Sequence, residues 1–501
     1  MTQPIFVSVC LCLAFPALAA MAQEARLYSV YAWCGRNADQ LKSELKPLEP
    51  LRLEGMMNDW LAGAAGLLAS KPMDVTVTIE GPNELKSAVS LKVVGEVPGP
   101  EKQGKLTWWL DPVIADPAKL GDLSQDVRNW TAIRDFPRLH LSPAQPVMLW
   151  LTVKTHQLPC GVWNGSIVVS DAGAARSVMP IEVNVLPVEL PVDNPIIGYS
   201  YTSFRERRDL ALMALDYGIN ACGYYDNWDM CRELGFRFYK FAIPFVNSQG
   251  KFMDAEDQQV IKEGIEPIRE IIARLKLKPE EWGIEIFDEP FDDLAWAYVA
   301  WGVRLRRLWP EAQLWSNIGY SGTHHNVATV KDTVDPMKPY VNFWCPYIKY
   351  LESSSADVLN AIRATRRPVW YYSIEYRHSR QSKGGRWMPW LAWKYHLQGW
   401  SFYSLDNCGT GADAWRGNSC ARSYPGPTPS LWLEALRQGV QDYKRLWLLE
   451  QKGVSRKTLD QLADPVLDFQ NHVSISMDFD KCASARRELD RMLLGMAADE
   501  R

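Results

Sequence analysis

The pattern of hydrophobic and polar positions divides the chain into two parts. In the first part, short runs of alternating or β-branched residues are separated by Gly and Asp turns. Short strands at such spacing are typical of a β-sandwich. A proline-rich segment, 186–195, follows them, and three prolines in ten residues cannot continue a central strand. We therefore expect the sandwich to end near Leu186 and a stiff linker to follow it. The predicted strands are 74–79, 147–153, 166–170 and 179–185.

After residue 195 the pattern changes to short apolar runs that alternate with helical patterns such as 257–275 and 294–309. Such alternation predicts a parallel sheet, and eight units in roughly 210 residues fit a (β/α)8 barrel. A doubly wound open sheet is the alternative, but no GxGxxG follows the first strand. A further amphipathic helix is expected at 431–449. The eight runs are 196–204, 219–225, 236–245, 282–287, 313–320, 341–347, 368–375 and 399–406.

These patterns predict an α/β protein in which an all-β sandwich precedes a TIM-like barrel. A chain of 501 residues is also too long for one ordinary hydrophobic core, which favours two domains. We expect the sandwich domain at 23–190 and the catalytic barrel at 196–450. A helical tail, 451–501, should pack outside the barrel.

Residues 1–22 have the pattern of an export signal. An apolar stretch runs from Ile5 to Ala19, and Ala20-Met21-Ala22 offers a small-x-small cleavage site. The usual positive region is missing, since no Lys or Arg occurs before Arg26. The apolar run is too short to span a membrane comfortably, and no later stretch is long and apolar enough. We expect a secreted or periplasmic protein without stable membrane insertion.

Composition narrows the class of ligand. A net charge of −4 argues against a nucleic-acid partner. The 22 tryptophans suit a protein that stacks aromatic faces on sugar rings, although buried Trp is ordinary. Eight of the ten cysteines lie after residue 22, and export would permit disulfides among them. No CxxC or HExxH occurs, so we expect no structural zinc site and no cofactor.

The fourth barrel run ends in two adjacent acids, Asp288 and Glu289, followed by Pro290. Such acids are costly at the end of an apolar strand unless they are paired, solvated or functional, and barrel active sites lie at these strand ends. Apolar neighbours and the charge of Asp288 would raise the pKa of Glu289, as a general acid for glycoside hydrolysis needs. We expect Pro290 to favour an extended Glu289. The alternative is that Asp288 only helps to cap the next helix.

Several segments together resemble glycoside hydrolase family 123, the β-N-acetylgalactosaminidase-like enzymes with an N-terminal β-sandwich and a barrel. The resemblance covers most of residues 75–450. The segments that carry it are Phe287-Asp288-Glu289-Pro290, Phe343-Trp344-Cys345-Pro346, Val369-Trp370-Tyr371-Tyr372-Ser373, 386–399 and 429–443.

The resemblance implies substrate-assisted catalysis, in which the 2-acetamido oxygen of the sugar attacks the anomeric carbon. It implies that Asp288 orients and stabilises the acetamido group and that Glu289 acts as acid, then base. It also places Tyr372 against the acetamido pocket. The chain departs from the family at Trp432, where the motif Pro-Ser-x-Arg has arginine. This change bears on the substrate sugar more than on the reaction class.

Glu375, after the seventh run, keeps a second mechanism open. Many barrel glycosidases pair an acid/base after strand four with a nucleophile after strand seven, and Glu289 and Glu375 occupy those places. Carboxyls about 5–5.5 Å apart would indicate a retaining two-carboxylate enzyme. The alternative role for Glu375 is an ion pair with Arg377 or Arg380. A third hypothesis is a non-catalytic carbohydrate-binding protein on the same fold.

The candidate substrate-binding residues are Tyr372, Trp344, Trp370, Arg386 and Glu375. For each tryptophan, a place in the barrel core is the alternative. The patterns predict an exported glycoside hydrolase, and the resemblance implies that it removes N-acetylhexosamine from a glycan substrate, with β-GalNAc as the expected sugar.

Overall fold

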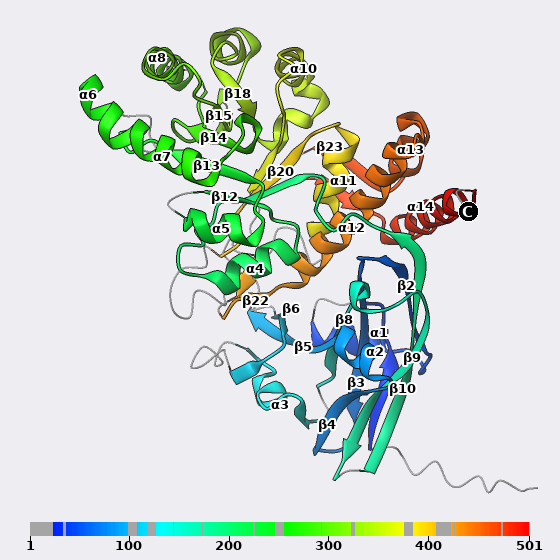
Figure 1. Ribbon diagram of the computed structural model, residues 1–501. Coiled ribbons are helices and arrows are strands. Elements are labelled where there is room, and N and C mark those ends of the chain that lie inside the picture. The colour runs from blue at the N-terminus through cyan, green and yellow to red at the C-terminus, as the bar shows by residue number, and fades with distance from the viewer. Residues whose placement is uncertain are drawn as a thin grey trace, which may run out of the picture.

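The structure is a computed structural model of the whole chain, in which the N-terminal strands form one half and the barrel the other (Figure 1). The predicted export signal, 1–22, lies outside the described residues. The structure describes residues 24–33, 37–98, 108–118, 127–143, 145–172, 174–223, 226–245, 255–291, 293–321, 326–374, 384–406, 422–424, 426–471 and 474–499.

The N-terminal half consists of two five-stranded sheets that share one hydrophobic core. Alternate residues of each sheet point inward, as Leu149 and Val169 do, and both are fully buried. This arrangement confirms the predicted sandwich. One sheet has the order β1 (Ala25–Ser29), β3 (Trp60–Ala69), β8 (Val147–Lys154), β5 (Val89–Pro98), β6 (Trp108–Ile114). The other has the order β2 (Leu51–Met57), β10 (Ala174–Glu189), β9 (Gly161–Asp171), β4 (Met73–Glu80), β7 (Arg138–Leu141). Short helices are α1 (Ala38–Glu44), α2 (Asn83–Ala88) and α3 (Trp130–Ile133).

Strand β10 continues three residues beyond the expected end of the sandwich at Leu186. It runs through Pro187 to Glu189, and its register with β2 shifts between Leu186 and Glu189. A proline has no N–H to donate to the ladder, so an irregular pairing is where a strand tolerates it. The first barrel strand begins at Ile197. The connection is therefore shorter than the proline pattern suggested.

The second half is a closed barrel in which each strand lies parallel to its sequence neighbours. The ring closes between β18 and β19, because Trp370 N–H donates to Trp344 O over 2.7 Å and Tyr372 N–H donates to Pro346 O over 3.1 Å. Each of the eight predicted runs contains one strand, which confirms the barrel. The strands are β11 (Ile197–Ser200), β12 (Ala221–Gly223), β13 (Phe238–Ala242), β14 (Trp282–Glu285), β15 (Leu314–Ser316), β18 (Val341–Trp344), β19 (Tyr372–Ile374) and β20 (Gly399–Tyr403).

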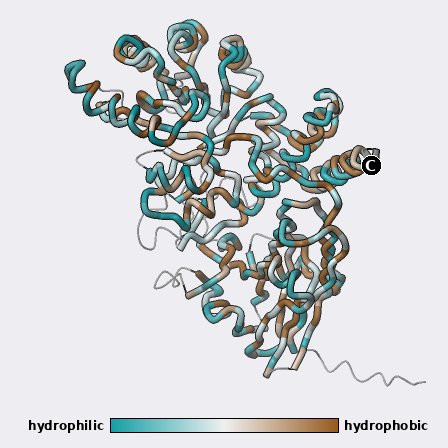
Figure 2. The backbone as a smooth tube through the Cα atoms, viewed as in Figure 1, coloured by the Kyte–Doolittle hydropathy of each residue, from teal (hydrophilic) through white to brown (hydrophobic). Residues whose placement is uncertain are grey.

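Helices surround the barrel, and hydrophilic and hydrophobic residues alternate along them (Figure 2). The predicted helix 257–275 consists of α6, a π-helical turn at Val260–Ile265, and α7. Two small hairpins, β16 (Tyr320–Ser321) with β17 (Asn326–Val327) and β21 (Ser423–Tyr424) with β22 (Thr428–Pro429), follow barrel strands. The helices are α4 (Arg208–Asp216), α5 (Trp228–Leu234), α6 (Asp257–Gln259), α7 (Glu266–Leu275), α8 (Asp293–Leu308), α9 (Asp335–Met337), α10 (Ala356–Ala364), α11 (Trp387–Lys394) and α12 (Leu431–Gln451).

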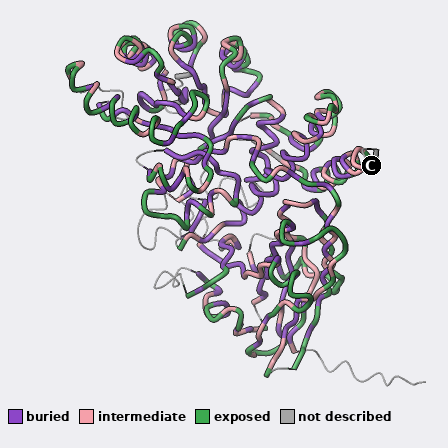
Figure 3. The backbone as a smooth tube through the Cα atoms, viewed as in Figure 1, coloured by how far each residue is buried: buried purple, intermediate pink, exposed green. Residues whose placement is uncertain are grey.

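Helix α12 lies between the sandwich and the barrel and is buried over most of its length (Figure 3). Several of its charged residues are paired within this junction. Arg445 contacts Asp59 of the sandwich and Asp490 of the tail, and Glu434 receives hydrogen bonds from Lys92 and Tyr217. The junction is therefore polar as well as apolar.

The tail contains two helices, and also a hairpin that the sequence did not predict. Its elements are α13 (Arg456–Ala463), β23 (Leu467–Asn471), β24 (Ser474–Met477) and α14 (Phe479–Asp499). Among the described residues, no helix combines the length and the apolar character that crossing a membrane requires.

Candidate active site

A cavity of about 600 Å³ lies at the carboxyl ends of the barrel strands. Its walls come from the segments that follow β11, β14, β15 and β20, together with residues of β19 and β20. Ligands of (β/α)8 barrels bind at this end, because eight strand-to-helix loops converge there. Asp288, Glu289 and Tyr372 all line the cavity, so the structure brings three of the predicted site residues together.

The carboxyl of Glu289 is held by a buried tyrosine. Tyr372, only 2% exposed, donates its hydroxyl hydrogen to Glu289 Oε1. Burial raises the pKa of Glu289, the Tyr372 hydrogen bond opposes that rise, and the charges of Asp288 and Glu285 add to it. A carboxyl that stays protonated above its ordinary pKa is suited to act as a general acid.

Asn317, which follows β15, connects the two acids. Its amide nitrogen donates to Asp288 Oδ1 and, over 3.0 Å, to the hydroxyl of Tyr201. Its amide oxygen accepts from the backbone N–H of Glu289 over 3.3 Å. Asn317 is buried, so its rotamer is fixed by packing as well as by these bonds. Asn317 was not among the residues predicted from the sequence, although it is a polar residue within the apolar run 313–320.

The backbone of Glu289 differs from the extended geometry that Pro290 led us to expect. Its φ is +51°, in the left-handed region. That conformation is rare for a residue with a side chain and more so before proline. Gly319 packs directly against it: a Cβ at this glycine would lie 2.4 Å from Glu289 Cβ. The missing side chain of Gly319 therefore makes room for the acid.

Neither a protein-family model nor a curated protein matches the chain. Among solved structures, it is similar to a family 123 glycoside hydrolase from Clostridium perfringens, which was analysed for glycolipid glycan hydrolysis. The TM-score is 0.62 at 13% identity, and the match covers 95% of this chain and 97% of that chain. The chain has the fold of a family 123 glycoside hydrolase. A family 39 glycoside hydrolase from Bacteroides cellulosilyticus aligns over 79% of this chain and 82% of that chain at 10% identity, but its TM-score of 0.39 is too low to indicate a common fold.

On this family 123 fold, the loop after β11 forms one wall of the cavity. Asp226 fixes the loop, because its carboxylate accepts from the hydroxyl of Ser203 over 3.0 Å and from the N–H groups of Phe204 and Gly223. Burial raises the pKa of Asp226 to about 6, and these hydrogen bonds oppose the rise.

The same wall is tied to the neighbouring segment of the cavity wall by an ion pair. Arg207, from the loop after β11, contacts Asp406, which follows β20. Arg205 also lines the cavity from this loop. The rim therefore carries both signs of charge around the two acids.

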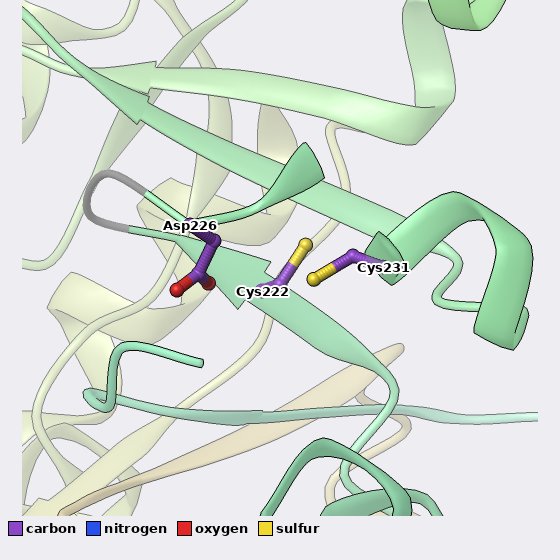
Figure 4. A group of neighbouring side chains, drawn as sticks. All are labelled: Cys222, Asp226 and Cys231. Carbon is purple, nitrogen blue, oxygen red and sulfur yellow. The ribbon is translucent and has the colours of Figure 1, made fainter. Parts of the chain in front are cut away.

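Asp226 also belongs to a buried group with Cys222 of β12 and Cys231 of α5 (Figure 4). Their ligand-type atoms lie within 4.8 Å of one another, and Figure 4 shows the two sulfur atoms side by side. A cation there would displace the N–H and O–H donors of Asp226, and three ligands are one fewer than tetrahedral zinc takes in structural sites. We therefore infer that Asp226 serves to hold the loop after β11 in place and not to bind a metal.

Three predicted substrate-binding residues lie elsewhere in the fold, which corrects the sequence analysis. Trp344 and Trp370 are 0% and 2% exposed and belong to the packed barrel core, where Trp370 meets Phe238 at 4.7 Å between ring centroids. Arg386 is buried against Asp442, with Nε 2.8 Å from a carboxylate oxygen. None of the three lines the cavity.

Two further positions, Glu375 and Trp432, were singled out from the sequence. Glu375 lies outside the described residues. Trp432, where the family motif has arginine, is buried, packs on Phe402 at 5.0 Å, and carries the guanidinium of Arg422 at 4.5 Å over its ring. A cation from another part of the chain thus lies beside the tryptophan.

Proposed function

We propose that this protein is an exported glycoside hydrolase that removes N-acetylhexosamine from a glycan by substrate-assisted catalysis, with β-GalNAc as the expected sugar. The observation that carries the proposal is that two adjacent acids in one cavity have different surroundings, which suit them to different roles. Glu289 has a raised pKa and a buried tyrosine partner, whereas Asp288 is hydrogen-bonded by Asn317. The family 123 fold supports the reaction class.

The proposed reaction uses the two acids in sequence. Protonated Glu289 donates its proton to the glycosidic oxygen while the acetamido oxygen attacks the anomeric carbon. The carboxylate of Asp288 accepts the acetamido N–H and stabilises the positive charge that develops on the resulting oxazolinium ring. Glu289, now a carboxylate, removes a proton from the water that opens this ring. Asn317 keeps Asp288 aimed during both steps.

Two further parts of the proposal rest on other observations. The apolar run and small-x-small site within 1–22 support export. The glycolipid glycans named for the Clostridium perfringens protein are the natural substrates to try first.

A screen with chromogenic glycosides tests the proposal. We expect turnover of N-acetyl-β-hexosaminides and little or none of the matching hexosides, because these lack the nucleophile. A thiazoline that mimics the oxazoline should inhibit strongly, since it resembles the species that the site stabilises. Turnover of plain hexosides at comparable rates would contradict the mechanism, and no turnover of any glycoside or glycolipid would contradict the function.

The retaining two-carboxylate mechanism is separated by a pair of variants. Substrate assistance predicts that Asp288→Asn loses most turnover and that Glu375→Gln loses far less. The two-carboxylate mechanism predicts the reverse, together with a covalent glycosyl adduct on Glu375. Trapping of that adduct by mass spectrometry would replace our mechanism with the alternative.

A further inference from the structure

An ion pair lies in the barrel interior beneath the two acids. Lys240 of β13 places its ammonium 2.7 Å from a carboxylate oxygen of Glu285, the last residue of β14, and the side chains are only 1% and 4% exposed. Removing two charges from water is expensive, and apolar residues of similar size usually stabilise a core at least as well. The proposed reaction does not use either residue, so their place in the core needs another explanation.

The ammonium of Lys240 is surrounded by aromatic rings. It lies 4.3 Å from the ring centroids of both Tyr201 and Trp315, and 5.0 Å from that of Tyr199. A cation attracts the face of an aromatic ring, more strongly where water is excluded. Tyr201 lines the cavity, so Lys240 restrains a residue of the site itself.

Tyr201 passes this restraint to the catalytic pair. Its hydroxyl accepts a hydrogen bond from the amide of Asn317, and the same amide donates to Asp288. Ring, amide and carboxylate therefore form a continuous chain of contacts from Lys240 to Asp288. At the other end of the ion pair, Glu285 belongs to the strand whose extension carries Glu289.

The charges of the ion pair and of the two acids also influence one another. The negative charge of Asp288 raises the pKa of Lys240, although burial, the larger effect, lowers it. The negative charge of Glu285 contributes to the raised pKa of Glu289. The charge of Asp288 therefore favours the protonated form of Lys240, and the charge of Glu285 favours the protonated form of Glu289.

We propose that the buried Lys240–Glu285 ion pair is the positioning element of this site: its cation fixes Tyr201 and Asn317 beneath Asp288, and its anion holds that cation in place. This inference rests on the roles of Asp288 and Glu289 in the proposed function. Lys240 and Glu285 are positioning residues, because they act through others.

Other titratable groups also face Glu289 and the cavity. Burial raises the pKa of Tyr372, Tyr199 and Cys345 well above their ordinary values, so these groups stay neutral near neutral pH. The other titratable groups that line the cavity are Asp288, Tyr201, Tyr403, Arg205, Arg207 and Asp406.

The test removes both charges together, in Lys240→Met with Glu285→Gln, so that no unpaired charge is left buried. We expect kcat to fall about 10–100-fold with KM nearly unchanged, as for misplaced catalytic groups. Glu285→Gln alone should move the basic limb of the pH profile to lower pH, because Glu289 loses a negative neighbour. Lys240→Arg, which keeps the positive charge, should keep kcat near the wild-type value.

The matched control is Arg232→Met with Glu281→Gln, which removes an ion pair near the other end of β14. It should leave kcat and the pH limbs unchanged. A thermal unfolding curve for each variant distinguishes a loss of folded protein from a change in catalysis. A loss of folded protein lowers the rate equally at every pH. If the Lys240 and Glu285 variants lower only the melting temperature, the positioning role is wrong.

A crystal structure of the double variant decides the inference independently of activity. We expect the Tyr201 hydroxyl to lie beyond hydrogen-bonding distance of Asn317. An unmoved Tyr201 and Asn317 would overturn the proposal even if the wild-type enzyme turned over no hexosaminide. The absence of wild-type turnover, by contrast, contradicts only the proposed function.

Discussion

At the scale of single residues, Glu289 combines a half-buried side chain with a strained backbone. A non-glycine residue in the left-handed region costs on the order of 1–3 kcal/mol and persists only where its surroundings fix it. Here Asn317 holds the N–H of Glu289, and Gly319 leaves space for its side chain. Strain of this kind gathers at functional sites, because precise aim matters more there than stability.

The role of Glu289 predicts the effect of Glu289→Gln. The amide keeps the shape of the side chain but neither donates nor recovers the proton. General acid/base catalysis is typically worth about 10²–10⁴-fold, so kcat/KM on substrates with poor leaving groups should fall by that factor. Thermal unfolding should be unchanged. Near-normal turnover of a natural glycan by the variant would remove Glu289 from the mechanism.

The hydroxyl of Tyr372 predicts a pH effect. Its hydrogen bond lowers the pKa of Glu289, which burial raises above the ordinary value. A general acid works while protonated, so activity is lost as pH rises through this pKa. Tyr372→Phe should raise the pKa further and move the basic limb of kcat/KM to higher pH. A limb that moves to lower pH, or stays in place, would show that the tyrosine does not act on Glu289.

Gly319 predicts a loss of activity from one added methyl group. In Gly319→Ala, the new Cβ would displace Glu289, and a misplacement of about 1 Å is enough to cost about 10²-fold in rate. Gly495→Ala on α14 is the control, because nothing lies within 4 Å of its Cβ position. We expect steady-state kinetics to show the loss only in the first variant. Equal rates would mean that Glu289 is not confined by Gly319.

At the scale of elements, the sequence predicts what depends on local pattern. Barrel strands are short and apolar, so each run was visible, and the acids after β14 were conspicuous at its end. Asn317 and Gly319 were not found, because their roles depend on β15 lying beside β14. Trp344 and Trp370 were misplaced because an aromatic run does not reveal which residue faces the core.

Arg386 shows the same limit, since its partner Asp442 lies 56 residues further along the chain. The structure predicts that Arg386→Met lowers stability rather than substrate affinity. Breaking a buried pair costs about 3–5 kcal/mol, and Arg486 and Trp390 still contact Asp442, so we expect the lower end. Denaturant titration should show this loss, with KM unchanged for the folded fraction. A raised KM without a loss of stability would restore Arg386 to the substrate site.

At the scale of the whole molecule, sandwich and barrel are joined through α12 rather than through the linker alone. The sequence predicted this helix and its amphipathic pattern, but its charged face turned out to be buried. Residues far apart in the sequence form pairs of this junction, as Arg445 and Asp59 do at 386 positions. Such pairs follow from the packing of two domains, which local periodicity does not encode.

The junction predicts that the two domains unfold together. Arg445 is fully buried between Asp59 of the sandwich and Asp490 of the tail, so Asp59→Asn leaves its charge only partly compensated. The free energy of unfolding should fall by about 3 kcal/mol, and calorimetry should show one transition at a lower temperature. The surface change Asp171→Asn, which breaks an exposed pair with Arg176, should cost at most about 1 kcal/mol. Two separate transitions in the wild-type protein, or equal losses in both variants, would show that α12 does not couple the sandwich to the barrel.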